Sequence, residues 1–396
     1  MAERALSAKE DRGCSLGGSV DYPFLILTLL LLTVGLAVLY SASAAQSAYD
    51  TGGATSTRYL QRQAVCAGLG LLAMYGFSRV PARVWYRLAW PCYWLSILLL
   101  LSVLLVGQQV NGARRWINIG GLQFQPSEIS KFTLILLLSR LSSVYGEKAA
   151  RFRYGVLGFG GALLGILIPL ALEKHLSAIM LMGMVAAVMM FVAGTRVRWL
   201  LGAAAGAVVF LVVYVSLMGY AGDRITAWLH PERDPGDTGY QILQSLYAIG
   251  SGGLFGLGLG KSRQKYLYLP FQYNDYIFAI LCEELGLVGA LGIMTLFALL
   301  ILRGYRIALN APDRFSTVLS AGLVTLIAVQ TLLNFGVVTN LLPSTGVALP
   351  FFSYGGTALA VNLGEMGIVL AVSRGRYRPK RQERRFGLPD QQEESV

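Results

Sequence analysis

The chain has 396 residues, of which 55% are hydrophobic and 14% are charged, and its formal net charge is +12. Soluble domains carry about 25% charged residues, so this composition excludes an ordinary soluble protein and indicates an integral membrane protein. The four cysteines, at positions 14, 66, 92 and 282, have neither the spacing of a metal site nor that of a disulfide framework.

Ten apolar stretches are long enough to cross a bilayer, since a spanning helix needs roughly 20 mostly apolar residues. They cover about 22–43, 63–79, 86–107, 128–145, 154–173, 176–194, 199–219, 276–302, 316–337 and 353–373. We therefore expect an all-α integral membrane protein with about ten transmembrane helices. One long extracytoplasmic loop is expected between helices 7 and 8.

The distribution of Lys and Arg predicts the orientation. The segments on the side of the N-terminus hold 21 of these residues and the opposite segments hold 10, so both termini are expected in the cytoplasm. We predict a cytoplasmic tail at 1–21, a membrane domain at 22–373 with its long loop at 220–275, and a basic cytoplasmic tail at 374–396. No cleavable signal peptide is predicted. The basic tail is expected to rest on anionic membrane lipids, and the net charge does not indicate nucleic-acid binding.

The second outer loop reads GQQVNGARRWINIGGLQFQPSEISK, and its Asn111-Gly112 pair predicts a turn. Arg114 and Arg115 stand beside Trp116, a combination that suits a phosphate or pyrophosphate headgroup through forked hydrogen bonds. An aromatic anchor with two snorkelling arginines is an equally good interpretation.

Several polar residues fall within or next to the predicted spans. Glu128 and Lys131 are three apart and share a helical face, and we favour an internal ion pair over a functional site. His175 stands in the short hairpin EKHLSA, where solvation is the favoured interpretation. Glu365 is a buried acid with no evident partner in the sequence.

The long outer loop begins with an acidic, turn-rich part and continues as ILQSLYAIGSGGLFGLGLGK. Its apolar spacing predicts a short amphipathic helix that ends at Gly252-Gly253. The glycine-rich end, with Lys261 and Lys265 after it, either presents backbone N–H groups to an anion or is a flexible linker.

Asp275 ends this polar interval directly before the apolar run YIFAI. A carboxylate at the lipid boundary meets both water and a lipid headgroup, and partial loss of water suits a general base. The alternative is the N-cap of the next helix, and both roles are compatible. Glu283 and Glu284 lie deeper and are expected to bind neighbouring helices or a polar cavity.

The last outer loop, NLLPSTGVALPFFSYGGTAL, carries no charge. Apolar non-helical backbone is tolerated at membrane depth only inside protein or along a cavity. We therefore expect this loop to re-enter the membrane domain and to wall a cavity beneath the long loop, with Ser353 as a candidate substrate contact.

Five segments together resemble the SEDS family (shape, elongation, division and sporulation), whose members include FtsW, RodA and SpoVE. The segments are NGARRWI, QPSEISK, DPGDTGYQILQSLYAIGSGGLFGLGLGKSRQKYLYLP, NDYIFAILCEELG and PSTGVALPFFSYGG. They occur in the family's order over nearly the whole chain, and NGARRWI leans toward the FtsW and SpoVE branch.

The resemblance implies a multi-pass peptidoglycan glycosyltransferase of the bacterial cytoplasmic membrane. Such an enzyme polymerises lipid II, a disaccharide-pentapeptide on undecaprenyl pyrophosphate, on the outer face of the membrane for division or sporulation cell-wall synthesis. Its implied partners are a class B penicillin-binding protein and other divisome or elongation proteins. The family's essential aspartate, in a segment usually read as PE-x-x-TDFIF, aligns with Asp275.

The chain departs from the family pattern near this aspartate. Phe271, Asn274 and Tyr276 stand where Glu, Thr and Phe are usual, and an EPDLGT-like turn appears as EKHLSA. Asp275 is intact, but no role of the usual Glu carries over, and the role of His175 is left open.

The expected mechanism is glycosyl transfer with inversion, in which Asp275 takes the proton from the 4-hydroxyl of the acceptor sugar. Lys131 and Glu128 are expected to shape the cavity floor, and basic side chains are expected to neutralise the pyrophosphate leaving group. The basic candidates are Arg114, Arg115, Lys261 and Lys265.

No tightly bound cofactor is expected. Asp223, Asp234 and Asp237 are candidates to hold a divalent cation, Mg²⁺ or Mn²⁺, although their spacing does not show it. One alternative function is a transporter that flips lipid II without chemistry, and another is a scaffold for division partners. The motifs cluster on the outer face, whereas a transporter needs access from both faces, and this favours the enzyme.

Overall fold

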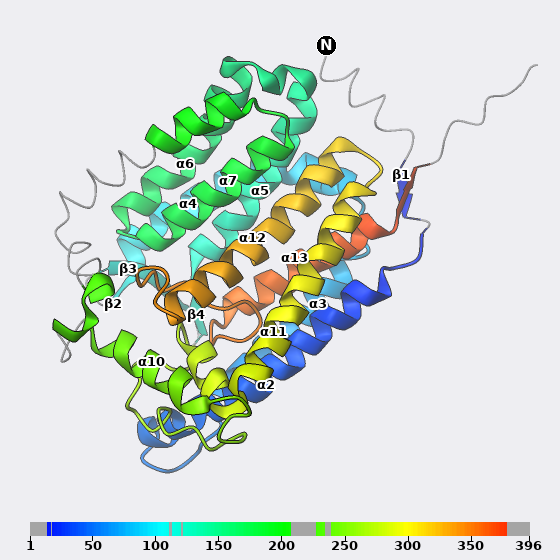
Figure 1. The fold of residues 1–396 in the computed structure, drawn as a ribbon. Helices are drawn as coiled ribbons and strands as arrows, with labels where there is room; N and C mark the ends of the chain where they lie inside the picture. Colours follow the sequence, from blue (N-terminus) through cyan, green and yellow to red (C-terminus); the bar gives the residue numbers. More distant parts are fainter. Residues whose placement is uncertain are drawn as a thin grey trace, which may run out of the picture.

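The computed structural model is a bundle of helices with short helices and irregular segments at one end (Figure 1). It describes residues 14–16, 18–110, 113–119, 122–206, 227–233 and 239–377. The long helices are α2 (Tyr22–Asp50), α3 (Arg58–Phe77), α4 (Ala82–Val106), α5 (Pro126–Tyr145), α6 (Phe159–Leu172), α7 (Leu176–Val192), α11 (Ile277–Leu309), α12 (Arg314–Val338) and α13 (Thr357–Ser373). The short helical elements are η1 (Gly146–Ala150), η2 (Arg153–Gly158), η3 (Pro231–Arg233) and α10 (Tyr240–Gly252).

Each predicted span except the seventh coincides with one of the long helices. The seventh, 199–219, is described only as far as residue 206, and residues 197–206 are helical. Among the described residues, five helical stretches are long and apolar enough to cross a membrane: α2, α4, η2 with α6, α11 and α12. The all-α membrane fold is confirmed, and the number of ten spans stays a prediction.

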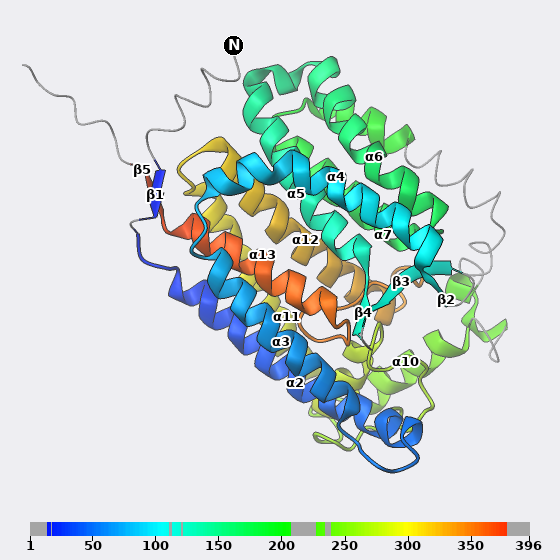
Figure 2. The same cartoon turned by 180° about the vertical axis from the view of Figure 1, so that it is seen from behind.

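The outer helices of the bundle carry apolar side chains on their outward faces. Leu72 of α3 is 70% exposed, and Leu98 of α4 is 63% exposed. By contrast, α12 buries most of its side chains and lies in the middle of the bundle beside α5 and α13 (Figure 1, Figure 2). Exposed leucines on long apolar helices suit the hydrocarbon of a bilayer.

The two ends of the described chain meet at one end of the bundle. Strand β1 (Cys14–Leu16) pairs antiparallel with β5 (Gly375–Tyr377), and Leu16 lies opposite Gly375. Both strands lie at the end of the bundle away from α10 (Figure 1). This arrangement is the one expected when both termini are on the same side of the membrane.

The second outer loop forms a small antiparallel sheet that the sequence analysis did not predict. It consists of β2 (Gln108–Val110), β3 (Ala113–Ile119) and β4 (Leu122–Phe124). The predicted turn at Asn111-Gly112 lies outside the described residues, and the flanking Val110 and Ala113 are paired.

The predicted amphipathic helix in the long loop is confirmed. Helix α10 ends at Gly252, and its C-cap Gly253 has φ +54°, a left-handed conformation that glycine adopts without steric cost. The glycine pair therefore stops the helix where the sequence indicates.

The segment between α12 and α13 enters the bundle without forming a helix. A Cβ placed on Gly35, near the middle of α2, would lie 3.0 Å from the carbonyl carbon of Phe351. The buried rings of Phe351 and Phe352 also pack against Phe297 of α11, with centroids 6.5 and 5.8 Å away. Because Gly35 and Phe297 lie well inside long helices, the predicted re-entry of this loop is confirmed.

Candidate active site

Asp275 lies at the end of the turn-rich segment that joins α10 to α11. Helix α11 begins at Ile277, and its N-cap is Tyr276, which makes no capping hydrogen bond through its side chain. The N-cap position is therefore one residue after Asp275. Its side chain is partly exposed, where the apolar helix meets the outer segments.

Two side chains hold the backbone next to Asp275. Asn334 of α12 donates through Nδ2 to the carbonyl of Asp275 at 2.7 Å and to that of Val347 at 2.9 Å. Ser353 of the re-entrant loop donates to the carbonyl of Asn274 at 2.6 Å and accepts a backbone N–H at 2.8 Å. Ser353 is 5% exposed, so its hydroxyl fixes the backbone. It does not face a substrate, contrary to the expectation from the sequence.

A glycine lies against the Asp275 carboxylate. Gly346 has φ +67°, and a Cβ added there would lie 3.3 Å from Oδ2 of Asp275. The carbonyl of the preceding Thr345 accepts a hydrogen bond from Ser177, at the start of α7. Helix α7 and the re-entrant loop therefore meet next to this carboxylate.

Three tyrosines and one glutamine join α3 to the same region. The ring of Tyr59 lies 4.5 Å from that of Tyr273 and 5.0 Å from that of Tyr354 between centroids. Buried Gln63 donates to the carbonyl of Ser353 and accepts a backbone N–H of the re-entrant loop, each at 3.1 Å. Helix α3 thus braces both segments that position Asp275, a role that the sequence analysis missed.

A second group of polar side chains, here called the polar cluster, comes from β3, α5, the α6–α7 turn and α13. Its members are Arg115, Glu128, Lys131, Glu173, His175 and Glu365. Lys131 and Glu128 form the expected ion pair at 2.7 Å, with side chains 6% and 12% exposed. Glu365 is 2% exposed and interacts electrostatically with both, and no described residue donates a hydrogen bond to its carboxylate.

The α6–α7 turn adds two buried groups to the polar cluster. Burial raises the pKa of Glu173 to about 8, and the charge of Arg115 partly opposes this shift. Burial, and then the charges of Arg115 and Lys131, lower the pKa of His175 to about 3. His175 is therefore buried and neutral at pH 7, and the expectation of a solvated histidine is wrong.

The polar cluster brings two cations together with three acids. At pH 7 most of the Glu173 population holds its proton, so this acid adds little negative charge. Arg115 and Lys131 are cations, and Glu128 pairs with one of them. Glu365 also lies near Lys131, so the cations and acids of this cluster interact where an electrostatic interaction is stronger than in water.

Arg114 and Arg115 do not act as a pair. They are consecutive residues of a strand, so their side chains point to opposite faces. Exposed Arg114 donates to the carbonyl of Leu104 at 3.0 Å, whereas half-buried Arg115 donates to that of Lys174 at 2.5 Å. The predicted forked clamp is wrong, and only Arg115 belongs to the polar cluster. Trp116 is half-buried beside them.

Lys265 is buried and bound within the protein. Its Nζ lies 3.2 Å from Oε1 of Glu284 and 3.2 Å from Oγ of Ser41 in α2. Ser41 itself donates to Glu284 at 2.6 Å. Lys265 therefore ties the long loop to α2 and α11 and is not placed to meet a pyrophosphate, contrary to our expectation. Lys261 is exposed.

The glycine-rich turn closes a break in α11. Gly286, with φ +65°, interrupts this helix. The carbonyls of Glu283 and Glu284 accept hydrogen bonds of 3.0 Å from the turn, and two N–H groups beyond the break donate back to it at 2.9 and 3.1 Å. The turn's donors are Leu257 and Gly258, and its acceptors are Gly253 and Leu254. This segment is therefore a fixed part of the bundle, neither a flexible linker nor an anion site at these N–H groups.

Among the residues that the structure describes, no three His, Cys, Asp or Glu side chains are grouped so as to hold a metal ion. Asp223, Asp234 and Asp237 lie outside those residues. The divalent cation therefore stays a prediction.

The comparisons with known proteins agree on one family. Residues 22–378 match the family of cell cycle proteins named for FtsW, RodA and SpoVE. Stage V sporulation protein E of Bacillus subtilis is 41% identical over 369 residues, which cover 90% of this chain and 97% of that protein. A probable peptidoglycan glycosyltransferase FtsW of Geobacter metallireducens is 41% identical over 358 residues, covering 89% and 94%.

Solved structures show the same similarity. A chain from a peptidoglycan synthase complex, solved to explain the coordination of polymerization and crosslinking, superposes with a TM-score of 0.75 at 32% identity. The match covers 90% of this chain and 98% of that one. The rod shape determining protein RodA of Thermus thermophilus superposes with a TM-score of 0.67 at 30% identity, covering 90% and 97%.

Proposed function

The chain belongs to the FtsW/RodA/SpoVE family of cell cycle proteins, and from this membership we infer that it is a peptidoglycan glycosyltransferase of the bacterial cytoplasmic membrane. Its several membrane-crossing helices agree with that location. In this proposal it polymerises lipid II into glycan strands on the outer face of the membrane, for division or sporulation cell-wall synthesis.

The observation that supports the assignment of the reacting group is the fixed position of Asp275. Its backbone is held by Asn334, and the preceding carbonyl is held by Ser353. A general base must be held within hydrogen-bond reach of the proton that it removes. Asp275 takes the proton of the acceptor sugar's 4-hydroxyl while that oxygen bonds to the donor's anomeric carbon. The bond from this carbon to the lipid pyrophosphate breaks, its electron pair leaves with the pyrophosphate, and the configuration inverts.

The leaving group requires charge neutralisation more than a proton. Arg115 and Lys131 of the polar cluster are the cations that we assign to this task, because buried donors stabilise developing negative charge most strongly. A pyrophosphate leaves without a second carboxylic acid, whereas glycosidases use two carboxyl groups. One carboxylate at Asp275 is therefore sufficient for the transfer.

A class B penicillin-binding protein is the partner we propose, together with other division or elongation proteins. The similar solved chain comes from a peptidoglycan synthase complex. On the outer segments of this chain, Phe255 and Leu259 are 81% and 65% exposed, and exposed apolar side chains suit a protein contact.

The experiment that tests this function mixes the purified chain and its class B partner with lipid II in detergent, with a penicillin present to block crosslinking. Glycan strands longer than lipid II are the expected product. A folded complex that binds lipid II, forms no strands and moves a fluorescent lipid II across liposome membranes would replace the enzyme with a transporter.

A further inference from the structure

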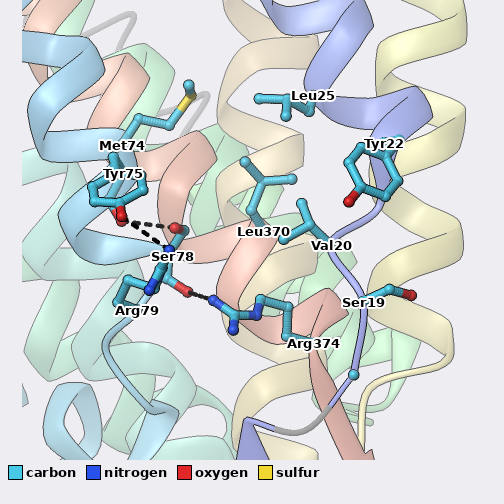
Figure 3. Close-up of a pocket in the computed structure, with 11 residues that line it drawn as sticks. Ser19, Val20, Tyr22, Leu25, Met74, Tyr75, Ser78, Arg79, Leu370 and Arg374 are labelled. Atoms are coloured by element: carbon cyan, nitrogen blue, oxygen red, sulfur yellow. Dashed lines mark hydrogen bonds between the residues drawn. The ribbon is translucent and has the colours of Figure 1, made fainter.

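A pocket of about 410 Å³ opens at the end of the bundle opposite to the candidate active site, where α2 begins and where α3 and α13 end. Arg79 and Arg374 line it, and no acidic residue lines it in the part of the chain that the structure describes. Figure 3 shows both arginines on one side of the opening, with Leu25, Met74 and Leu370 farther along the helices. The pocket therefore has a cationic mouth and an apolar wall.

The two guanidinium groups retain hydrogen-bond donors for a ligand. Arg374 donates from Nη1 to the carbonyl of Ser78 at 3.3 Å, and its Nε is buried with no acceptor among the described residues. Exposed Arg79 stacks on the ring of Tyr75 at 4.7 Å and donates to its hydroxyl at 2.9 Å. A guanidinium has five N–H donors, so the hydrogen bond that caps the end of α3 uses only some of the donors of Arg374.

The acid next to the pocket does not oppose an anion. Asp21 precedes α2, and its carboxylate is already bound by Arg303, with Nη2 to Oδ2 at 2.9 Å and Nε to both oxygens at 3.0 and 3.1 Å. The same carboxylate accepts the N–H of Phe24 at the start of the helix. Among the residues that the structure describes, the charge that faces the pocket is therefore that of the two arginines.

We propose that this pocket binds the phosphate of an anionic phospholipid from the cytoplasmic leaflet. Arginine side chains recognise phosphate through forked, charge-assisted hydrogen bonds. The predicted orientation places the ends of α2, α3 and α13 at the level of the inner headgroups. The apolar wall formed by Leu25, Met74 and Leu370 gives the first part of an acyl chain a surface that runs toward the hydrocarbon. A free phosphate shares the headgroup chemistry but has no apolar part that would contact this wall.

The test uses native mass spectrometry of the full chain, purified in detergent and stripped of lipid. Phosphatidylglycerol and phosphatidylcholine with the same acyl chains are titrated onto the wild type, Arg79→Gln, Arg374→Gln and the double variant. Arg196→Gln is the matched control, because Arg196 is exposed on the same predicted side and is not among the lining residues. One tight phosphatidylglycerol is expected on the wild type and the control. Its binding should weaken about fivefold for each pocket arginine removed and about 25-fold in the double variant.

Three results would overturn the proposal. Binding of phosphatidylglycerol to the double variant as tightly as to the wild type would show that the pocket is not the site. An equal weakening of binding in Arg196→Gln would show the same. Displacement of the lipid by an excess of inorganic phosphate would assign the site to a soluble phosphate instead. Arg79 is exposed, so Arg79→Gln should fold normally. If Arg374→Gln is unstable, the comparison of Arg79→Gln with the wild type still tests the proposal.

Discussion

Replacing Gly256 by alanine should separate the glycine-rich turn from the break in α11. Gly256 has φ +79°, and a Cβ there would lie 2.5 Å from the carbonyl carbon of Glu284 and 2.7 Å from the nitrogen of Gly286. Both are backbone atoms, so no side-chain rotation relieves the overlap. The turn would have to move away from the helix.

Two effects add to the cost of this substitution. An alanine in the left-handed region costs about 1–2 kcal/mol. Moving the turn also removes the hydrogen bonds from Leu257 and Gly258, which leaves two carbonyls without partners at about 1–3 kcal/mol each. The expected loss of unfolding free energy is therefore about 3–8 kcal/mol. Gly260→Ala is the matched control: φ is +77°, and the nearest atom to its Cβ is 4.0 Å away, so only the conformational cost of about 1–2 kcal/mol applies.

The assay heats the wild type and both variants in the same detergent and measures the fraction that remains monodisperse. Gly256→Ala should lose its folded fraction at a clearly lower temperature than Gly260→Ala, which should stay close to the wild type. Equal losses in the two variants would mean that backbone strain alone decides the outcome, and this would refute the packing argument.

Three other perturbations test separate parts of the structure. Lys265→Met should destabilise the fold by about 3–5 kcal/mol because the Glu284 carboxylate stays buried without its cation. Adding Glu284→Gln should restore part of this stability in the same heating assay. No restoration would contradict a stabilising Lys265–Glu284 ion pair. Asn334→Ala should slow polymerisation about 10- to 100-fold by loosening the Asp275 backbone while lipid II still binds; a parallel loss of binding would contradict a positioning role. Burial raises the pKa of Glu173 from 4.5 to about 8, so its contribution to stability is complete below pH 4.5 and falls by about 1.4 kcal/mol per pH unit up to pH 8. Glu173→Gln should remove that slope between pH 5 and 8, and an unchanged slope would contradict the assignment.

The helices could be predicted from the sequence because a bilayer accepts few alternatives to long apolar helices. The Glu128–Lys131 pair was also predictable, since a spacing of three places both on one helical face. The end of α10 at Gly252 followed from the glycine pair. In each case the signal lies within a few residues of the feature that it determines.

Contacts between distant segments could not be predicted in the same way. The Lys265–Glu284 pair joins residues 19 apart, and Ser41 reaches it from 224 positions away. Nothing in the local sequence says which carbonyl will accept from the glycine-rich turn. The break in α11 at Gly286 was not predicted, because a single glycine in an apolar run is compatible with a continuous helix.

In the candidate site, the sequence analysis selected Asp275 but not the side chains that hold its backbone. Gln63 and Asn334 are amide side chains inside predicted spans, and polar groups at membrane depth signal a specific contact, so a signal existed that the sequence analysis did not use. The clamp was one of two interpretations of Arg114 and Arg115, and it required both side chains on one face, because no strand was predicted there. The alternation of side chains along a strand separates them.

We propose that Asp275 is the general base of glycan polymerisation. The measurement that tests it compares the rate of strand formation from lipid II by wild type and Asp275→Asn, each in complex with the class B partner. Lipid II binding and complex assembly are measured on the same preparations. The asparagine variant should form strands about 10²–10⁴-fold more slowly, with lipid II binding and complex assembly unchanged. An asparagine variant that polymerises at the wild-type rate would contradict it.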